Sequence, residues 1–289
     1  MYHKTIGYKW FSVFNHIFLI TMAILCVLPL IHVLAVSFSG KAAASANIIN
    51  LLPVDFTLDA YEKTLTNPQF TQALFNSFYR TVLGTFIAMS VTIFAGYALS
   101  KEFKSRNYYM WFLVFTMLFS GGLVPNYILI SNLNMIDTVW ALVLPGALSV
   151  FNLILLMNFF RTIPISLEEA ARIDGAGFFK ILFKIYLPLS MPGIATVALF
   201  TMVGHWNSWF DGLIYMMKAE NYPLATFLQT IVVQQDMSKI SADPSLLENL
   251  SQRTVQAAQI FIGALPILLV YPFLQKYFVK GIVLGSVKE

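Results

Sequence analysis

Aromatic and polar side chains gather in residues 204–211, which read GHWNSWFD. Sugars present apolar C–H faces that stack on aromatic rings, and hydroxyls that need hydrogen-bonding partners. Trp206 and Trp209 supply rings, while His205 and Asn207 supply polar atoms. These four residues are therefore candidates for lining a substrate pathway. The alternative is an aromatic belt at a membrane–water interface.

A second informative segment is the loop 161–187, RTIPISLEEAARIDGAGFFKILFKIYL. Ser166 and Glu169 have the spacing of a capping box, which predicts a helix start at Ser166. Glu168 and Arg172 are four residues apart and can pair across one helical turn. The DGAG sequence that follows predicts a glycine turn, after which apolar residues predict a second, amphipathic helix.

The first of these loop helices carries small residues, Ala170 and Ala171, beside the charged Glu169 and Arg172. Small residues let another backbone approach closely, and flanking charges fix the register of a contact. This pattern favours a helix that docks into a cleft on a cytoplasmic partner. The alternative is an interfacial helix that lies on the lipid headgroups.

Several kinds of chemistry have no motif in the chain. It contains no phosphate-binding G-x-x-x-x-G-K-[ST] loop, no H-E-x-x-H and no G-x-S-x-G. Its four histidines lack metal-ligand spacing. No acid lies deep in an apolar run, which argues against an ion-coupled carrier. We therefore expect no catalytic residue, no metal site and no ATP hydrolysis on this chain.

The elements that must position these residues are membrane helices. Hydrophobic residues make up 58% of the 289 residues and charged residues 11%, against about 25% charged in soluble domains. This composition excludes a soluble enzyme and a disordered chain, and one cysteine excludes a disulfide scaffold. A net charge of +4 that is spread along the chain gives no indication of nucleic-acid binding.

Six stretches lack charged residues over the roughly 20 residues that a spanning helix needs. They predict an all-α integral membrane protein with six transmembrane helices, in one membrane domain of residues 1–289. The first stretch is too long for the apolar part of a signal peptide, so we expect a retained helix. The expected spans are about 12–36, 74–100, 107–130, 138–160, 188–216 and 254–277.

Charge in the loops predicts the orientation of these spans. With the N-terminus inside, 12 of the 18 Lys and Arg residues fall on the cytoplasmic side. Because Lys and Arg are enriched in cytoplasmic loops, we expect both termini, and the loop 161–187 between spans four and five, to be cytoplasmic.

The loop resembles a known motif. Glu169-Ala170-Ala171, Gly175, Ile185 and Leu187-Pro188 stand at the spacing of the EAA loop of bacterial ABC-importer permeases. The resemblance extends over nearly the whole chain, to the six-helix, maltose-permease-like family of carbohydrate uptake. Within it, the chain is most similar to permeases for complex or acidic oligosaccharides.

The resemblance implies a permease subunit, in the bacterial inner (cytoplasmic) membrane, that moves an oligosaccharide from a periplasmic or extracellular binding protein into the cytoplasm. Its implied partners are two ATP-binding subunits, a second, paralogous permease, the lipid bilayer and that binding protein, which would dock on the outer loop 217–253. ATP and Mg would be held by the ATP-binding subunits, with no cofactor on this chain. The implied coupling residues are Glu169, Ala170, Ala171, Arg172, Asp174, Gly175 and Ala176.

Other functions remain open at this point. An ABC permease for a non-sugar solute would carry the same loop. A passive channel or scaffold protein would leave the loop unexplained, and an intramembrane enzyme would need a nucleophile or metal cluster that the spans do not show.

Overall fold

The computed structural model describes residues 6–231 and 252–286, with side chains in 6–231 and 252–272. Throughout these ranges the regular structure is helical, with no strand, which confirms the expected all-α fold. The chain divides into two compact units. One comprises residues 1–71 and 230–265, and the other comprises 72–229 and 266–289.

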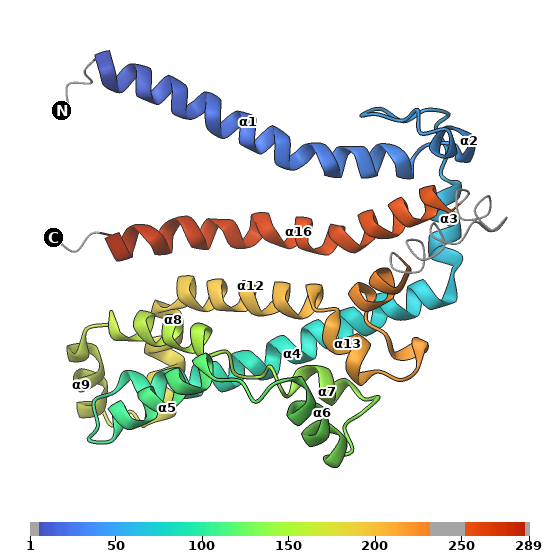
Figure 1. The fold of residues 1–289 in the computed structure, drawn as a ribbon. Helices are drawn as coiled ribbons and strands as arrows, with labels where there is room; N and C mark the ends of the chain where they lie inside the picture. The colour runs from blue at the N-terminus through green and yellow to red at the C-terminus, as the bar shows by residue number, and fades with distance from the viewer. Residues whose placement is uncertain (1–5, 232–251, 287–289) are drawn as a thin grey trace. The chain divides into compact units, whose positions relative to one another are not determined.

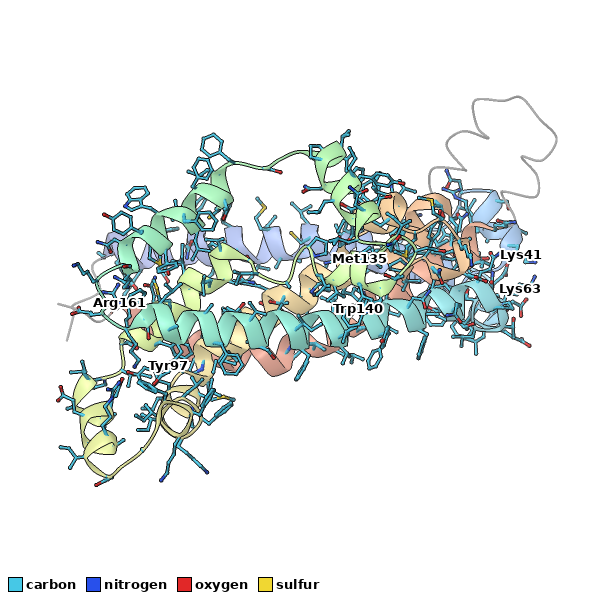
Figure 2. The ribbon with its side chains drawn as sticks, turned by 90° about the horizontal axis from the view of Figure 1, so that it is seen from below. Lys41, Lys63, Tyr97, Met135, Trp140 and Arg161 are labelled. Carbon is cyan, nitrogen blue, oxygen red and sulfur yellow. The ribbon has the colours of Figure 1, made fainter. Side chains whose placement is uncertain are left out.

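The first unit contains the long helix α1, two short helices and the first parts of two other long helices. Its helices are α1 (Ile6–Ser37), α2 (Lys41–Ser45), α3 (Asp59–Thr66), the start of α4 (Pro68–Ser100) and the first part of α16 (Arg253–Ser286). Arg253 donates to the carbonyl of Ala44 at 3.3 Å and to Asn47 Oδ1 at 2.9 Å, which ties the start of α16 to α2. Lys41 and Lys63 lie close together in this unit (Figure 2).

The second unit holds most of α4 and the helices that follow it (Figure 1). These are α5 (Arg106–Leu118), α6 (Leu123–Asn132), α7 (Val139–Val143), α8 (Val150–Arg161), α9 (Ile165–Ile173), α10 (Phe178–Ile181), a π-helical turn (Leu182–Tyr186), α11 (Leu187–Leu189), α12 (Met191–Asn207), α13 (Phe210–Tyr215) and a 3₁₀ turn (Ala219–Asn221). Residues 224–231 are also helical.

Three helices are long and apolar enough to cross a membrane: α1, α4 and the segment Arg253–Pro272 of α16. Three further pairs are sharply bent, by 110° between α5 and α6, 70° between α8 and α9, and 83° between α11 and α12. The 110° bend interrupts the expected span 107–130, and the break between α7 and α8 interrupts 138–160. The 83° bend and the break between α12 and α13 interrupt 188–216. The count of six spans stays a prediction, as does the single domain.

Two of the apolar clusters of the second unit lie at its opposite ends. One joins α4, α8, the π-helical turn and α12, and its centre is Tyr97, Leu156, Phe160, Ile181, Leu182, Tyr186 and Val197. The other joins α6, α7 and α13 through Ile130, Ala141, Leu142, Tyr215 and Met216. Figure 2 shows Tyr97 and Arg161 toward the end that carries α9, and Met135 and Trp140 toward the other.

Candidate functional site

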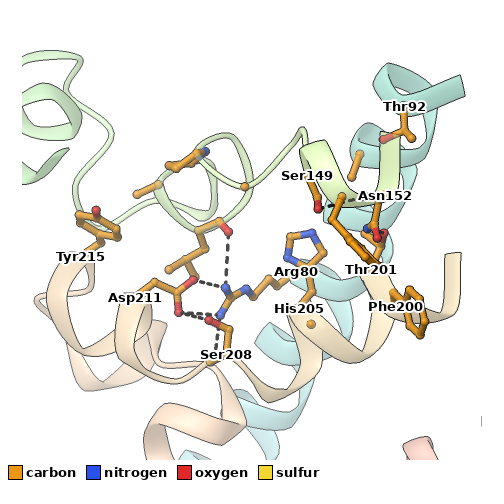
Figure 3. A pocket seen from close by; sticks show the side chains of 17 residues that line it. Arg80, Thr92, Ser149, Asn152, Phe200, Thr201, His205, Ser208, Asp211 and Tyr215 are labelled. Atoms are coloured by element: carbon orange, nitrogen blue, oxygen red, sulfur yellow. Dashed lines mark hydrogen bonds and ion pairs between the residues drawn. The ribbon is translucent and has the colours of Figure 1, made fainter. Parts of the chain in front are cut away.

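A cavity of about 710 Å³ lies in the second unit, between α4, α7, α8, α12 and α13 (Figure 3). Its lining combines small residues, the aromatic rings of two phenylalanines and one tyrosine, and several polar side chains. The polar and aromatic members are Arg80, Thr92, Ser149, Phe151, Asn152, Phe200, Thr201, His205, Ser208, Asp211 and Tyr215. The volume lies within the range of cavities that hold small organic ligands.

One ion pair closes part of the cavity wall. Arg80 on α4 pairs through both terminal nitrogens with the carboxylate of Asp211 on α13 (Figure 3). Arg80 Nη1 also donates to the carbonyl of Ser208 at 3.0 Å, and the hydroxyl of Ser208 donates to Asp211 Oδ1 at 2.8 Å. The Arg80 side chain is 3% exposed and that of Asp211 is 25% exposed, so the carboxylate is the more accessible partner.

Uncharged groups line the rest of the cavity. Asn152 Nδ2 on α8 donates to Thr201 Oγ1 on α12 at 3.3 Å, and this bond leaves the other Asn152 amide atoms for a ligand. The His205 ring lies directly against Gly84 on α4, where an added Cβ would meet Nε2 at 2.6 Å. Gly84 is therefore the residue that makes room for the ring.

The four residues of the predicted substrate pathway differ in burial, and they do not all line the cavity. His205 is buried and lines the cavity, as do Ser208 and Asp211 from the same run. Trp206 is buried but is not part of the cavity wall. Asn207 and Trp209 are exposed on the surface of this unit.

Arg80 was not among the residues expected to line a pathway, although the sequence carries a signal for it. Arg80 ends one charge-free stretch and Asp211 ends another, and both ends fall on the side assigned to the exterior. Opposite charges at one depth on two spans are candidates for a pair, because an ionisable group within a membrane is costly alone.

The loop 161–187 forms the other candidate site. Its helix α9 begins at Ile165 after Pro164, and no side chain caps it. The expected capping box of Ser166 and Glu169 is therefore wrong. Pro164 has an extended backbone at the N-cap position, so the helix has already begun when the chain reaches Ser166.

The end of α9 is a Schellman motif. The N–H of Ala176 donates to the carbonyl of Ala171 at 2.9 Å, and the N–H of Gly175 donates to that of Arg172 at 3.0 Å. Gly175 has φ of +77°, a conformation that favours glycine. The expected glycine turn is thus confirmed.

Most of the predicted coupling residues face outward. Glu169, Ala170, Arg172, Asp174 and Gly175 are exposed, while Ala171 and Ala176 pack on the apolar cluster around Tyr97. Large apolar side chains on the same loop are also exposed, including Ile165, Ile173, Phe178 and Phe179. An exposed apolar group flanked by charges is typical of a surface that binds another protein.

Glu168 turns inward from the same helix. Its carboxylate accepts hydrogen bonds from Arg172 at 2.8 Å, from the Tyr186 hydroxyl at 2.6 Å and from Lys101. Burial raises the pKa of Glu168, whereas the hydrogen bonds from these three donors lower it. The donors together outweigh burial, so the pKa lies below its usual value. The expected pair with Arg172 is confirmed, whereas the bonds to Lys101 and Tyr186 had no signal in the sequence.

Comparisons with known proteins agree with this architecture. Residues 88–284 match the family described as "Binding-protein-dependent transport system inner membrane component". The polygalacturonan/rhamnogalacturonan transport system permease protein YtcP of Bacillus subtilis (strain 168) is 41% identical over 97% of this chain and 99% of its own length. Protein LplC of the same organism is 39% identical over 99% and 97%.

Among solved structures, the chain is similar to one described as a bacterial ABC transporter involved in the import of the acidic polysaccharide alginate. The two share a TM-score of 0.85 and 31% identity, over 95% of this chain and 98% of that one. These relatives confirm the resemblance to ABC-importer permeases. The chain therefore belongs to the family of inner-membrane components of binding-protein-dependent transport systems.

Proposed function

We propose that this permease moves an oligosaccharide into the cytoplasm and that the cavity beside Arg80 is part of its path. The observation that carries the proposal is the cavity lining. Asn152, Thr201, Ser149 and the Asp211 carboxylate offer donors and acceptors for hydroxyl groups. Phe200 and other rings offer apolar faces for C–H groups. A carbohydrate presents hydroxyl groups and apolar C–H faces together, so it can use both kinds of contact.

The relatives favour a carbohydrate rich in carboxylates. Polygalacturonan and alginate, named for a Bacillus subtilis permease and for a solved importer, are both acidic polysaccharides. We therefore propose an acidic oligosaccharide as the substrate.

The proposed assembly follows the family pattern. An extracytoplasmic binding protein delivers the substrate, as the family description implies. A second, paralogous permease completes the pathway, and two ATP-binding subunits hold ATP and Mg. The exposed residues of α9 and its glycine turn dock on one of these subunits. The outer loop proposed for the binding protein falls largely within 232–251, outside the described residues.

The proposed topology has six spans with both termini in the cytoplasm. In this arrangement α9 lies on the cytoplasmic side, and the Arg80–Asp211 pair lies toward the exterior. Figure 1 supports this separation, because α9 and α13 lie at opposite ends of the second unit.

The test is reconstitution of the complex from its co-expressed operon into proteoliposomes. We expect two ATP-binding subunits and a second permease to co-purify in mild detergent. Radiolabelled oligogalacturonide should enter the vesicles only with ATP and the binding protein. Uptake of a maltooligosaccharide at an equal or higher rate would contradict the acidic substrate. Uptake of neither sugar, or uptake without ATP, would contradict the function.

A further inference from the structure

The side chain of Glu168 takes no part in the exposed surface of α9. It is 7% exposed, whereas its neighbour Glu169 is exposed. Three donors from three parts of the chain converge on its carboxylate: Lys101 after α4, Arg172 on α9 and Tyr186 in the π-helical turn. Such a carboxylate is fixed in place rather than offered to a partner.

Two aromatic rings lie against the ammonium group of Lys101, whose side chain is 26% exposed. Its Nζ lies 3.8 Å from the centre of the Tyr186 ring and 4.4 Å from that of Tyr97. The two rings meet edge to face at 5.0 Å, and Phe160 packs against both. A cation over an aromatic face is stabilised further when water is excluded. Lys101 is thus held by a carboxylate and by two rings at once.

The cluster of Glu168, Lys101, Tyr97 and Tyr186 joins three elements, and Phe160 on α8 adds a fourth. Tyr97 lies near the end of α4, Lys101 directly follows α4, Glu168 belongs to α9 and Tyr186 to the π-helical turn. Single π-helical turns within helices occur frequently at functional sites. The cluster is therefore the point at which α9 is fastened to the rest of the unit.

The helix α4 connects this cluster with the cavity. It is continuous from Pro68 to Ser100 and carries Arg80, Ala88 and Thr92 on the cavity wall. Arg80 and Tyr97 are separated by roughly 25 Å along the helix, at 1.5 Å per residue. A displacement of its cytoplasmic end as a rigid body therefore displaces the cavity wall as well.

We propose that Glu168 is a positioning residue that links the docking helix α9 to α4, so that movement of the ATP-binding subunits reaches the cavity through Lys101 and Tyr186. The proposal rests on the coupling role proposed above for α9. Adjacent residues thus have different roles. Glu169 contacts the ATP-binding subunit, and Glu168 transmits the movement of α9 to α4.

The central variant is Glu168→Gln, which keeps the size of the side chain and removes its charge. Lys101 then lacks its counter-ion inside the aromatic cluster, which weakens the link between α9 and α4. We expect the purified complex to retain its ATP-binding subunits and its basal ATP hydrolysis. Stimulation of hydrolysis by the loaded binding protein, and transport per ATP, should fall at least about fivefold, the lower end of typical coupling between sites.

Matched controls come from the same loops. Glu102→Gln and Lys104→Met change exposed side chains beside Lys101 and should leave stimulation unchanged. Lys101→Met should act like Glu168→Gln. The double variant should be no worse than either single one, because both remove the same interaction.

A more conservative variant keeps the test valid if Glu168→Gln fails to fold. Tyr186→Phe removes only the hydroxyl that donates to Glu168 and leaves the ring over Lys101 in place. It should lower stimulation in the same direction with normal assembly.

Three results would overturn the inference. They are full stimulation in Glu168→Gln, loss of bound ATP-binding subunits in Tyr186→Phe, and additive effects in the double variant. In each case wild-type transport would continue, so the proposed function would stand. Absence of ATP-driven transport in the wild-type complex would instead contradict the function itself.

Discussion

Arg80 and Asp211 form a pair in which the two partners are unequally exposed. Because the guanidinium is almost fully buried, removal of the carboxylate leaves a charge without a counter-ion. We expect Asp211→Ala to destabilise the complex by about 3 kcal/mol, the lower end of values for breaking a buried pair. The measurement is thermal unfolding in detergent.

The double variant Arg80→Met/Asp211→Ala serves as its control. It removes both charges, so it should recover a large part of the lost stability. A single Asp211→Ala variant as stable as the wild type would show that the pair contributes nothing to the fold.

Gly84 offers a second residue-scale prediction. An added Cβ would meet His205 Nε2 at 2.6 Å, which is too close, so the ring must move. We expect Gly84→Ala to cost about 1–3 kcal/mol, as overpacking does, and to lower uptake severalfold. Gly96→Ala on the same helix is the control, since its Cβ would have ordinary contacts starting at 3.6 Å. Equal uptake in the two variants would remove His205 from the pathway.

These residues show how far side-chain chemistry could be predicted. The composition of residues 204–211 placed His205, which lines the cavity, among the pathway candidates, because aromatic and polar groups together are unusual in a membrane helix. It did not separate His205 from Asn207 and Trp209, which face away from the cavity. That separation depends on where α12 ends and how α13 turns, which a residue list does not contain.

The turn after α9 gives a prediction at the scale of the element. Gly175 has φ of +77° and no atom within 4 Å of an added Cβ, so a substitution meets backbone strain and no clash within this chain. Gly175→Ala should cost about 1–2 kcal/mol, and Gly175→Asn less, because asparagine tolerates this conformation. Gly177→Ala, without positive φ, is the control.

Gly175→Arg tests docking beyond that strain. It should abolish stimulation of ATP hydrolysis by the loaded binding protein while the spans remain inserted, because a charge would enter the proposed contact. If it stimulated as well as Gly175→Ala, no partner surface would lie close to this turn.

The conformation of the loop between α6 and α7 depends on Asp137. Its carboxylate accepts from Asn221 Nδ2 at 2.9 Å and from the N–H groups of Met217 and Lys218, and its own φ is +62°. The pKa of Asp137 is lowered, and the hydrogen bond from Asn221 is the largest cause. The stabilisation is therefore present above the usual value of 3.8 and is lost as the pH falls through the lowered pKa.

We expect Asp137→Ala to speed proteolysis of this loop, because it loses the acceptor and strains the backbone by about 1–2 kcal/mol. Asp137→Asn keeps an acceptor and tolerates positive φ, so it should resemble the wild type. Equal proteolysis of both variants and the wild type would contradict this role.

The bends in the elements could not be predicted from apolar stretches. Between α5 and α6 the chain turns by 110° at a Ser-Gly-Gly sequence, and Gly122 has φ of +87°. Pro145 and Gly146 likewise separate α7 from α8. The charge-free stretches show only that charged residues are absent. A straight helix and a broken helix can lack charge equally, so the stretches do not distinguish them. The cavity lies along one such break, between α7 and α8.

At the scale of the whole molecule, the exposed apolar surface agrees with the membrane protein that the composition predicted. The most apolar window of α1 has no buried residue within the chain, and large apolar side chains are exposed along α4 and α5. In water these surfaces would associate, whereas the lipid of a membrane would cover them. Membrane class and family were therefore predictable from composition and the EAA spacing, while the packing between helices was not.

The orientation of the chain and the docking of α9 can be tested together by cysteine labelling. After Cys26, the sole cysteine, is replaced by serine, single cysteines are introduced at Ser105, Ser166 and Glu220. The charge distribution predicts that a membrane-impermeant reagent reaches the first two only from the cytoplasm and Glu220→Cys only from outside.

Because Ser166 lies on exposed α9, bound ATP-binding subunits should protect Ser166→Cys and leave Ser105→Cys less affected. Labelling of Ser166→Cys from outside would reverse the topology. Equal labelling with and without the subunits would keep the topology but remove α9 from the interface.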